Sequence, residues 1–76
     1  MIYEECIEIN PEIMMGKPVI KGTRIPVYVI LNLLGEGYDV EMVKKEYPDV
    51  TDKDILALLK FAAHTMKFEE IEGVLV

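Results

Sequence analysis

Cysteine and histidine are almost absent from this sequence of 76 residues, which contains one of each, Cys6 and His64. A single cysteine excludes a disulfide within the chain, and this pair alone excludes a closed zinc site of cysteine and histidine ligands. A domain this small buries only about 60% of its unfolded surface, so its stability is marginal unless something is added. We therefore expect self-association, as a dimer or larger homo-oligomer.

Long apolar runs and a targeting segment are also lacking. The longest uncharged apolar run, residues 25–35, is far shorter than the roughly 20 residues of a membrane-spanning helix. No charged segment followed by a long apolar stretch opens the chain, so we predict no signal peptide and no membrane contact. The length favours one domain over residues 1–76, and the expected compartment is the cytoplasm.

Basic residues are in short supply: 8 lysines and arginines stand against 14 carboxylates, for a net charge of −6. Phosphate neutralisation provides most of the affinity of non-specific nucleic-acid binding, so this balance argues against such binding. An interpretation as a DNA-binding protein therefore requires a local basic surface.

The N-terminal part, residues 1–25, reads as extended chain. Residues 6–9 and 18–20 contain β-branched residues and predict two short strands. Asn10-Pro11 and Gly16-Lys17-Pro18 predict turns between them. The sequence leaves open whether these strands pair within one chain or swap between two.

A first helix is expected to begin near Pro26, a residue suited to the first helical position, and to end at Gly35 or Gly37. The intervening residues are apolar on nearly every side of the helix, which predicts burial all round. One side would meet the core and the other a second subunit. The residues assigned to the dimer interface are Val27, Tyr28, Ile30, Leu31 and Leu34.

A second helix is predicted from an Asp39 cap to Lys45 or Glu46, with Glu41 and Lys45 spaced as a favourable pair. It is expected to be separated from each neighbouring helix by a four-residue turn.

Thr51 and Asp54 form a capping-box pattern at the start of a third helix, which is expected to reach Glu70 or Ile71. Residues 26–72 thus predict a tri-helical helix-turn-helix, followed by an apolar tail at residues 73–76. The fold class is mainly α with a short N-terminal β-hairpin or strand pair. The same helix spacing also fits a generic three-helix bundle with no role in nucleic-acid binding.

The third helix is predicted to have two contrasting faces. The apolar stripe assigned to the core consists of Ile55, Leu58, Leu59, Ala62, Ala63 and Met66. The opposite band, assigned to DNA, consists of Lys53, Ala57, Lys60, His64 and Lys67. These lysines recur every seven residues and form the local basic surface that DNA binding requires. A solvated outer face without a ligand explains the same pattern.

A second basic cluster, Lys17, Lys21 and Arg24, is flanked by glycines and also carries a phosphate-binding interpretation. The Gly-x-x-x-x-Gly-Lys-Ser/Thr pattern of a phosphate loop is absent. Alternatively, the glycines turn a hairpin and Arg24 pairs with a carboxylate from the acid-rich helices.

The segment Gly16-Lys17-Pro18-Val19-Ile20-Lys21-Gly22-Thr23-Arg24-Ile25-Pro26-Val27 closely resembles the signature of the bacterial and archaeal family called domain of unknown function 433. That family continues with a leucine-rich helix, a glycine turn, a Tyr-Pro-x-hydrophobic-Thr segment and a long helix rich in alanine and leucine. The corresponding segments here are 31–34, 37–38, 40–46, 47–51 and 55–63. The resemblance covers roughly residues 9–66 and leaves the last ten residues open.

This resemblance implies a homeodomain-like helix-turn-helix that acts as an antitoxin of the VapB type, with a PIN-like ribonuclease toxin as its partner. Such a homodimer would occupy its operator with two third helices in successive major grooves, roughly 34 Å apart. The acidic Glu69, Glu70 and Glu72, followed by the apolar tail, would dock on the ribonuclease. Alternatively, the tail covers the domain's own core or pairs with a second subunit.

The competing interpretation is a protein-interaction or dimerisation module without DNA binding, which the negative charge favours. Catalysis is not expected, because the spacing suggests no pairing of the single histidine with a cysteine or serine, and no metal cluster. We accordingly predict no cofactor, no metal and no small-molecule ligand. Cys6 is interpreted as a small core residue rather than a nucleophile.

Overall fold

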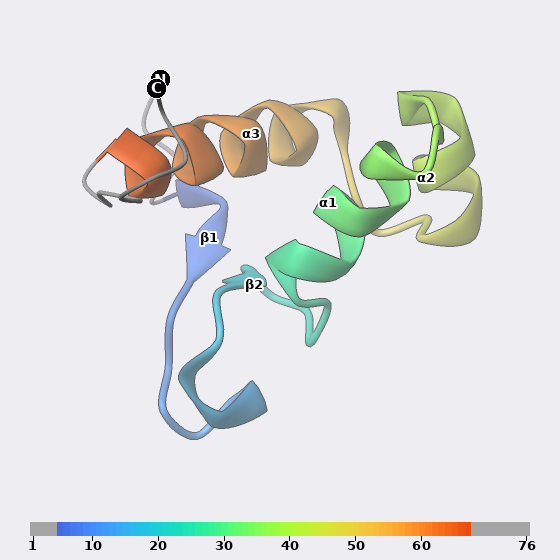
Figure 1. The fold of residues 1–76 in the computed structure, drawn as a ribbon. Coiled ribbons are helices and arrows are strands. Elements are labelled where there is room, and N and C mark those ends of the chain that lie inside the picture. The colour runs from blue at the N-terminus through green and yellow to red at the C-terminus, as the bar shows by residue number, and fades with distance from the viewer. Residues whose placement is uncertain (1–4, 68–76) are drawn as a thin grey trace.

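The computed structural model describes residues 5–67 and contains three helices and a two-stranded antiparallel sheet (Figure 1). This confirms the predicted mainly helical fold class. In chain order the elements are β1 (Ile7–Glu8), a 3₁₀ helix (Met14–Gly16), β2 (Val19–Ile20), α1 (Val27–Gly35), α2 (Val40–Glu46) and α3 (Asp52–Lys67).

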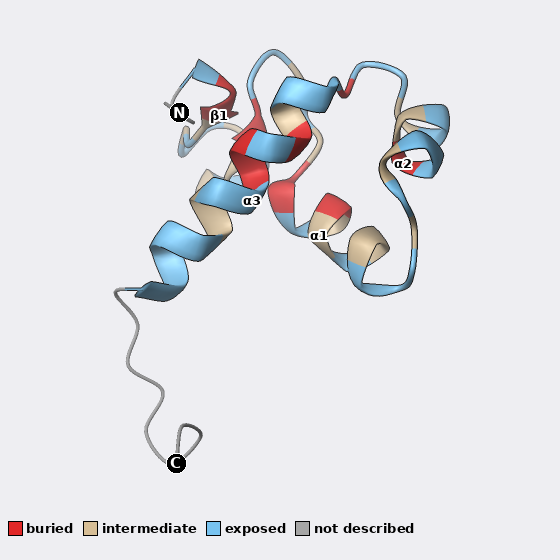
Figure 2. Cartoon of the chain, turned by 90° about the horizontal axis from the view of Figure 1, so that it is seen from above, coloured by how far each residue is buried: buried red, intermediate tan, exposed pale blue. Residues whose placement is uncertain are grey.

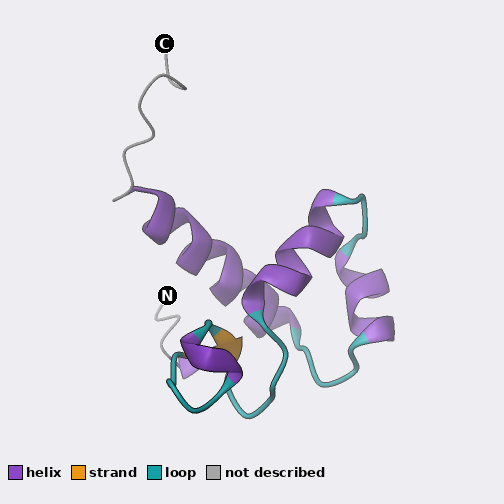
Figure 3. Ribbon diagram, turned by 60° about the horizontal axis from the view of Figure 1, so that its bottom comes forward, coloured by secondary structure: helices purple, strands orange, loops and turns teal. Residues whose placement is uncertain are grey.

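The two strands pair within the same chain, with Ile7 opposite Ile20 in register. The connection between them turns first at Asn10, whose side-chain oxygen accepts the backbone N–H of Glu12 at 2.9 Å. It turns again at Gly16, which has a φ of +85°. That left-handed conformation favours glycine and confirms the turn expected there. The hairpin projects from the end of the helical part at which α1 begins (Figure 3).

Helix α1 begins directly after Pro26, as its sequence predicts, and ends in a Schellman motif. The N–H of Tyr38 donates to the carbonyl of Leu33 at 3.0 Å, and the N–H of Gly37 donates to that of Leu34 at 3.1 Å. Gly37 has a φ of +102°, so it is this glycine that permits the sharp exit from the helix.

Capping side chains place the starts of α2 and α3 where the sequence predicts them. Asp39 accepts the N–H of Met42 at 2.8 Å. Thr51 and Asp54 exchange two hydrogen bonds, at 3.1 and 3.0 Å, as a capping box requires. The turn between α2 and α3 has five residues rather than the four expected, and the predicted extension of α3 beyond Lys67 lies outside the described residues.

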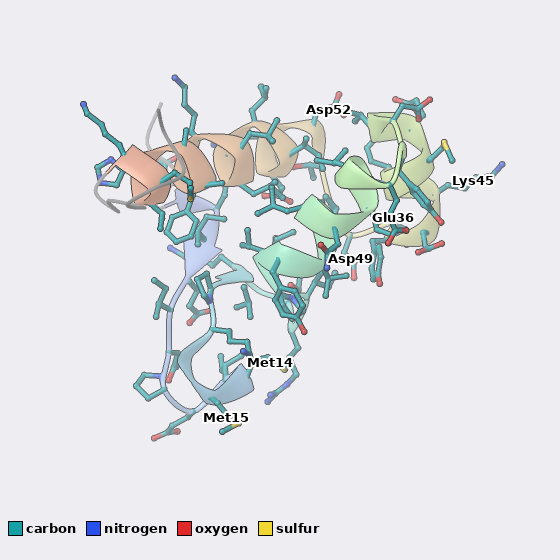
Figure 4. All side chains as sticks on the ribbon, in the orientation of Figure 1. Met14, Met15, Glu36, Lys45, Asp49 and Asp52 are labelled. Carbon is teal, nitrogen blue, oxygen red and sulfur yellow. The ribbon has the colours of Figure 1, made fainter. Side chains whose placement is uncertain are left out.

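Lys44 joins α2 to the beginning of α3. Its ammonium lies 2.8 Å from Asp52 and 3.2 Å from Glu41. The predicted pairing of Glu41 with Lys45 is therefore wrong: its partner is Lys44, one residue earlier. Asp52 lies at the end of α3 that faces α2 (Figure 4), which explains why a residue outside α2 takes part.

The core lies where α1, α3 and β1 meet (Figure 2). Its largest fully buried side chains are Val19, Ile20, Ile30, Val43, Val50 and Leu58. No side-chain nitrogen or oxygen that is buried within residues 5–67 lacks a hydrogen-bond partner. In this same range, no helix is long and apolar enough to cross a membrane.

Candidate interaction surface on the third helix

The orientation of α3 differs from the one predicted. Ala57 was assigned to the DNA-binding band, but its side chain is 0% exposed and packs in the core beside Leu58. Leu59, Ala63 and Met66 were assigned to the core, but all three are exposed. The helix is therefore rotated about its axis, and Phe61 packs against the core instead of these residues. The assignment of Ala57 to DNA is corrected, because a buried methyl group cannot reach a base edge.

The exposed side of α3 carries a row of four apolar residues, Leu56, Leu59, Ala63 and Met66, which we call the outer row. Leu56 is 58% exposed, Leu59 45% and Met66 55%. Their spacing of three, four and three residues keeps them on one side of a helix. Reasoning from the sequence missed this row because it placed three of its members in the core.

Lysines border the outer row. Lys60 and Lys67 directly follow Leu59 and Met66 in the sequence, and both are exposed. None of the salt bridges between described residues involves either of them. His64 is exposed on this helix as well. Of the predicted basic band, these three residues remain together on the exposed side.

Lys53 is exposed but differently engaged. Its ammonium donates to the Glu5 carboxylate at 3.2 Å, which links the first turn of α3 to the chain just before β1. This hydrogen bond, reinforced by the charge of Glu5, raises the pKa of Lys53. A ligand of this lysine would have to compete with that carboxylate.

The charge of α3 contrasts with that of the whole chain. No aspartate or glutamate occurs between Ile55 and Lys67, a stretch that contains two lysines and the histidine. Residues 5–67 carry eight basic and ten acidic side chains, so four of the six net negative charges belong to residues outside the described range. The local charge of this surface is therefore far less negative than the total suggests.

An apolar groove of about 520 Å³ lies between α1 and the last turns of α3. Tyr28 and Leu31 line it from α1, and Phe61 and Met66 from α3. It therefore adjoins the outer row through Met66. Lys17 stands at this groove with its ammonium 5.7 Å from the centre of the Tyr28 ring, a cation–π distance.

The helix assigned to the dimer interface is mostly turned inward. Val27 is 3% exposed and Ile30 0%, so these two are corrected: they belong to the core of a single chain. Leu31 and Leu34 are partly buried against that core. Tyr28, half exposed, is the interface candidate that α1 presents most openly to solvent.

The second basic cluster lies on the hairpin side of the molecule. Lys17, Lys21 and Arg24 are exposed, but Lys17 alone among them lines the groove beside α3. None of the salt bridges among residues 5–67 involves Arg24, so its suggested pairing with a helix carboxylate is not seen. Lys21 is held by its backbone, whose N–H donates to the carbonyl of Cys6 at 2.7 Å.

Cys6 is buried beneath α3, as predicted for a core residue. Loss of hydration on burial raises the pKa of its thiol, and the nearby Asp54 carboxylate raises it further. A thiol held protonated is a poor nucleophile and a poor metal ligand. Within residues 5–67, no group of three or more histidine, cysteine, aspartate or glutamate side chains is arranged to hold a metal ion.

Comparison with known proteins places this surface in a family. Residues 7–62 match the family described as "Protein of unknown function (DUF433)". The uncharacterized protein y4eO of Sinorhizobium fredii is 33% identical over 51 residues, which are 67% of this chain and 23% of that protein. This chain thus spans less than a quarter of that relative's length.

The fold has a solved counterpart as well. The crystal structure of a DUF433 member protein from Anabaena variabilis matches with a TM-score of 0.76 and 26% sequence identity. The match covers 82% of this chain and 61% of that one. Because the family match extends over most of the sequence and its fold agrees, the chain belongs to the DUF433 family.

Proposed function

We propose that this chain is a non-catalytic binding module that acts in the cytoplasm as the antitoxin of a toxin–antitoxin pair, with a PIN-like ribonuclease as its partner. The observation that carries the proposal is the exposed side of α3. In a chain this small, three large apolar side chains, Leu56, Leu59 and Met66, are about half exposed on one helix. Such patches mark protein-interaction sites.

The charges of the chain support a ribonuclease as partner. A ribonuclease binds a polyanion, so its active site is basic, and an acidic protein is attracted to it. This chain has a net charge of −6. The segment first suggested for docking, with Glu69, Glu70 and Glu72, lies outside the described residues, so the proposal rests on the net charge and on α3.

Operator DNA is a second candidate ligand, favoured by Lys60, His64 and Lys67 on the exposed side of α3. In a helix-turn-helix the last helix enters the major groove, and a homodimer presents two such helices. Two lysines and a histidine give few phosphate contacts, so this binding would be weak and sensitive to salt.

Co-expression tests the antitoxin proposal. The chain is produced together with a PIN-like ribonuclease encoded beside its gene, in cells whose growth the ribonuclease arrests. Restored growth is expected with the unmodified chain and with Lys45→Ala, a control on α2 that projects away from α3 (Figure 4). Leu59→Glu should abolish the rescue. Continued arrest despite normal levels of the folded, unmodified chain contradicts the proposal.

A gel-shift titration against the DNA upstream of the gene tests the second candidate. Lys60→Ala combined with Lys67→Ala should weaken binding and reduce the salt dependence by about two phosphate contacts, about one per lysine. Lys53→Ala should have less effect, because Glu5 already engages that lysine. Absence of any shift at low salt removes the DNA proposal and leaves the antitoxin proposal to the growth assay.

A further inference from the structure

We propose that the outer row of α3 is the docking site for an acidic amphipathic helix of the partner protein. This inference rests on the proposed function and names the part of the partner that would make the contact. It follows from the spacing of Leu56, Leu59, Ala63 and Met66, their exposure, and the charges beside them.

The spacing of the outer row is that of a helix–helix seam. Leu56 and Ala63 are seven residues apart, and Leu59 and Met66 occupy the intermediate positions, as a and d residues do in a heptad. From Leu56 to Met66 the helix rises roughly 15 Å, enough to contact about three turns of another helix. An apolar stripe with this repeat matches a helix whose own apolar residues recur every three and four positions.

The charges beside the row select an acidic occupant. Lys60 and Lys67 stand immediately after the d-type residues, at the flanking position where interhelical ion pairs form. No carboxylate on α3 from Ile55 onward competes for them. A partner helix with aspartate or glutamate at its own flanking positions would therefore gain two ion pairs in addition to apolar burial.

A second copy of the same helix fits this face less well. Two antiparallel copies would place the flanking lysines opposite one another, and two parallel copies would place them opposite Ile55 and Ala62, which offer no carboxylate. DNA also fits less well, because phosphates and base edges would leave most of the apolar row without matching contacts. The acidic helix is the occupant that uses both the apolar and the basic parts of the surface.

The test titrates the full chain into fluorescein-labelled helical peptides and follows anisotropy. One peptide carries leucine at a and d with glutamate at the flanking positions, and its counterpart carries lysine in place of glutamate. The acidic peptide should bind more tightly by about tenfold or more, equivalent to about 1.4 kcal/mol. High salt should narrow the difference, because exposed ion pairs are screened.

Three variants locate the binding on α3. Leu59→Ser should weaken the acidic peptide by about tenfold or more. Lys60→Glu combined with Lys67→Glu should reverse the preference toward the basic peptide. Lys45→Glu, on α2, should leave both affinities unchanged. All altered side chains are exposed, so unchanged far-ultraviolet circular dichroism is expected and confirms that each variant is folded.

Equal binding of the two peptides, or binding unaffected by Leu59→Ser, overturns the inference. Sedimentation that shows self-association abolished by Leu59→Ser assigns the row to a second copy and overturns it as well. The proposed function fails separately: if the peptide binds as expected but the ribonuclease still arrests growth, the docking surface stands and the antitoxin role falls.

Discussion

The two sides of α3 have similar residues and opposite environments. Leu58 and Ala57 are 0% exposed, whereas their neighbours Leu59 and Ala63 face solvent. The inner side is held by α1, by β1 and by the capping box at Thr51. The difference teaches that apolar character on this helix serves two purposes, folding on one side and association on the other. Matched substitutions on the two sides separate these purposes.

The largest expected effect is that of Leu58→Ala. Removing this fully buried side chain should lower the free energy of unfolding by about 2–5 kcal/mol, because it loses apolar burial and leaves a cavity. Leu59→Ala should stay within about 0.5 kcal/mol of the unmodified chain. Urea denaturation of both variants measures the contrast. Equal losses would mean that Leu59 is also packed in solution, which would contradict the exposed outer row.

Overpacking gives the next largest effect. Ala57→Leu should destabilise the chain by about 1–3 kcal/mol, since a 0% exposed methyl site has no room for three further carbon atoms. The matched Ala63→Leu should be close to neutral, because Ala63 faces solvent. Thermal unfolding measures both. A destabilising Ala63→Leu beside a tolerated Ala57→Leu would mean that the orientation of α3 described above is wrong.

Threonine at the two ends of α3 makes a finer comparison. Thr51→Ala should cost about 0.5–2 kcal/mol, because the hydroxyl accepts the Asp54 N–H at the helix start. The hydroxyl of Thr65 donates to the carbonyl of Phe61 at 3.0 Å, a group already used by the helix. Thr65→Ala should therefore be nearly neutral. Denaturation midpoints distinguish them, and comparable losses would remove the capping box as a cause of stability.

The smallest effect concerns Cys6 at high pH. Because burial raises the pKa of its thiol, the unfolded chain deprotonates first, from about pH 9 upward. The stability that this thiol contributes is complete below that pH and is lost as the pH rises through the folded-state pKa. Cys6→Val should therefore lose less stability than the unmodified chain between about pH 8 and pH 11. Parallel pH profiles of the two proteins would show that Cys6 has no part in the alkaline loss.

The sequence by itself determined the local features of this protein. Pro26 begins α1, Gly37 ends its turn, Asp39 caps α2, and the Thr51–Asp54 pair begins α3, because each acts through its own or neighbouring backbone. The motif beginning at Gly16 also identified the family correctly, since it is a property of residue order. The strand pair was predicted for the same reason: its turns are encoded in adjacent residues.

Only the tertiary structure decided which side of α3 faces inward. Nine of the twelve residues from 55 to 66 are apolar, so more than one stripe on this helix satisfies the requirement for a core face. The choice was made by packing against α1 and β1, which brings Phe61 and Ala57 inside and leaves Leu56 and Leu59 outside. The Lys53–Glu5 ion pair joins positions 48 residues apart and likewise depends on the fold. Local hydrogen bonding fixed where the helix begins, and long-range packing fixed the surface it offers to a partner.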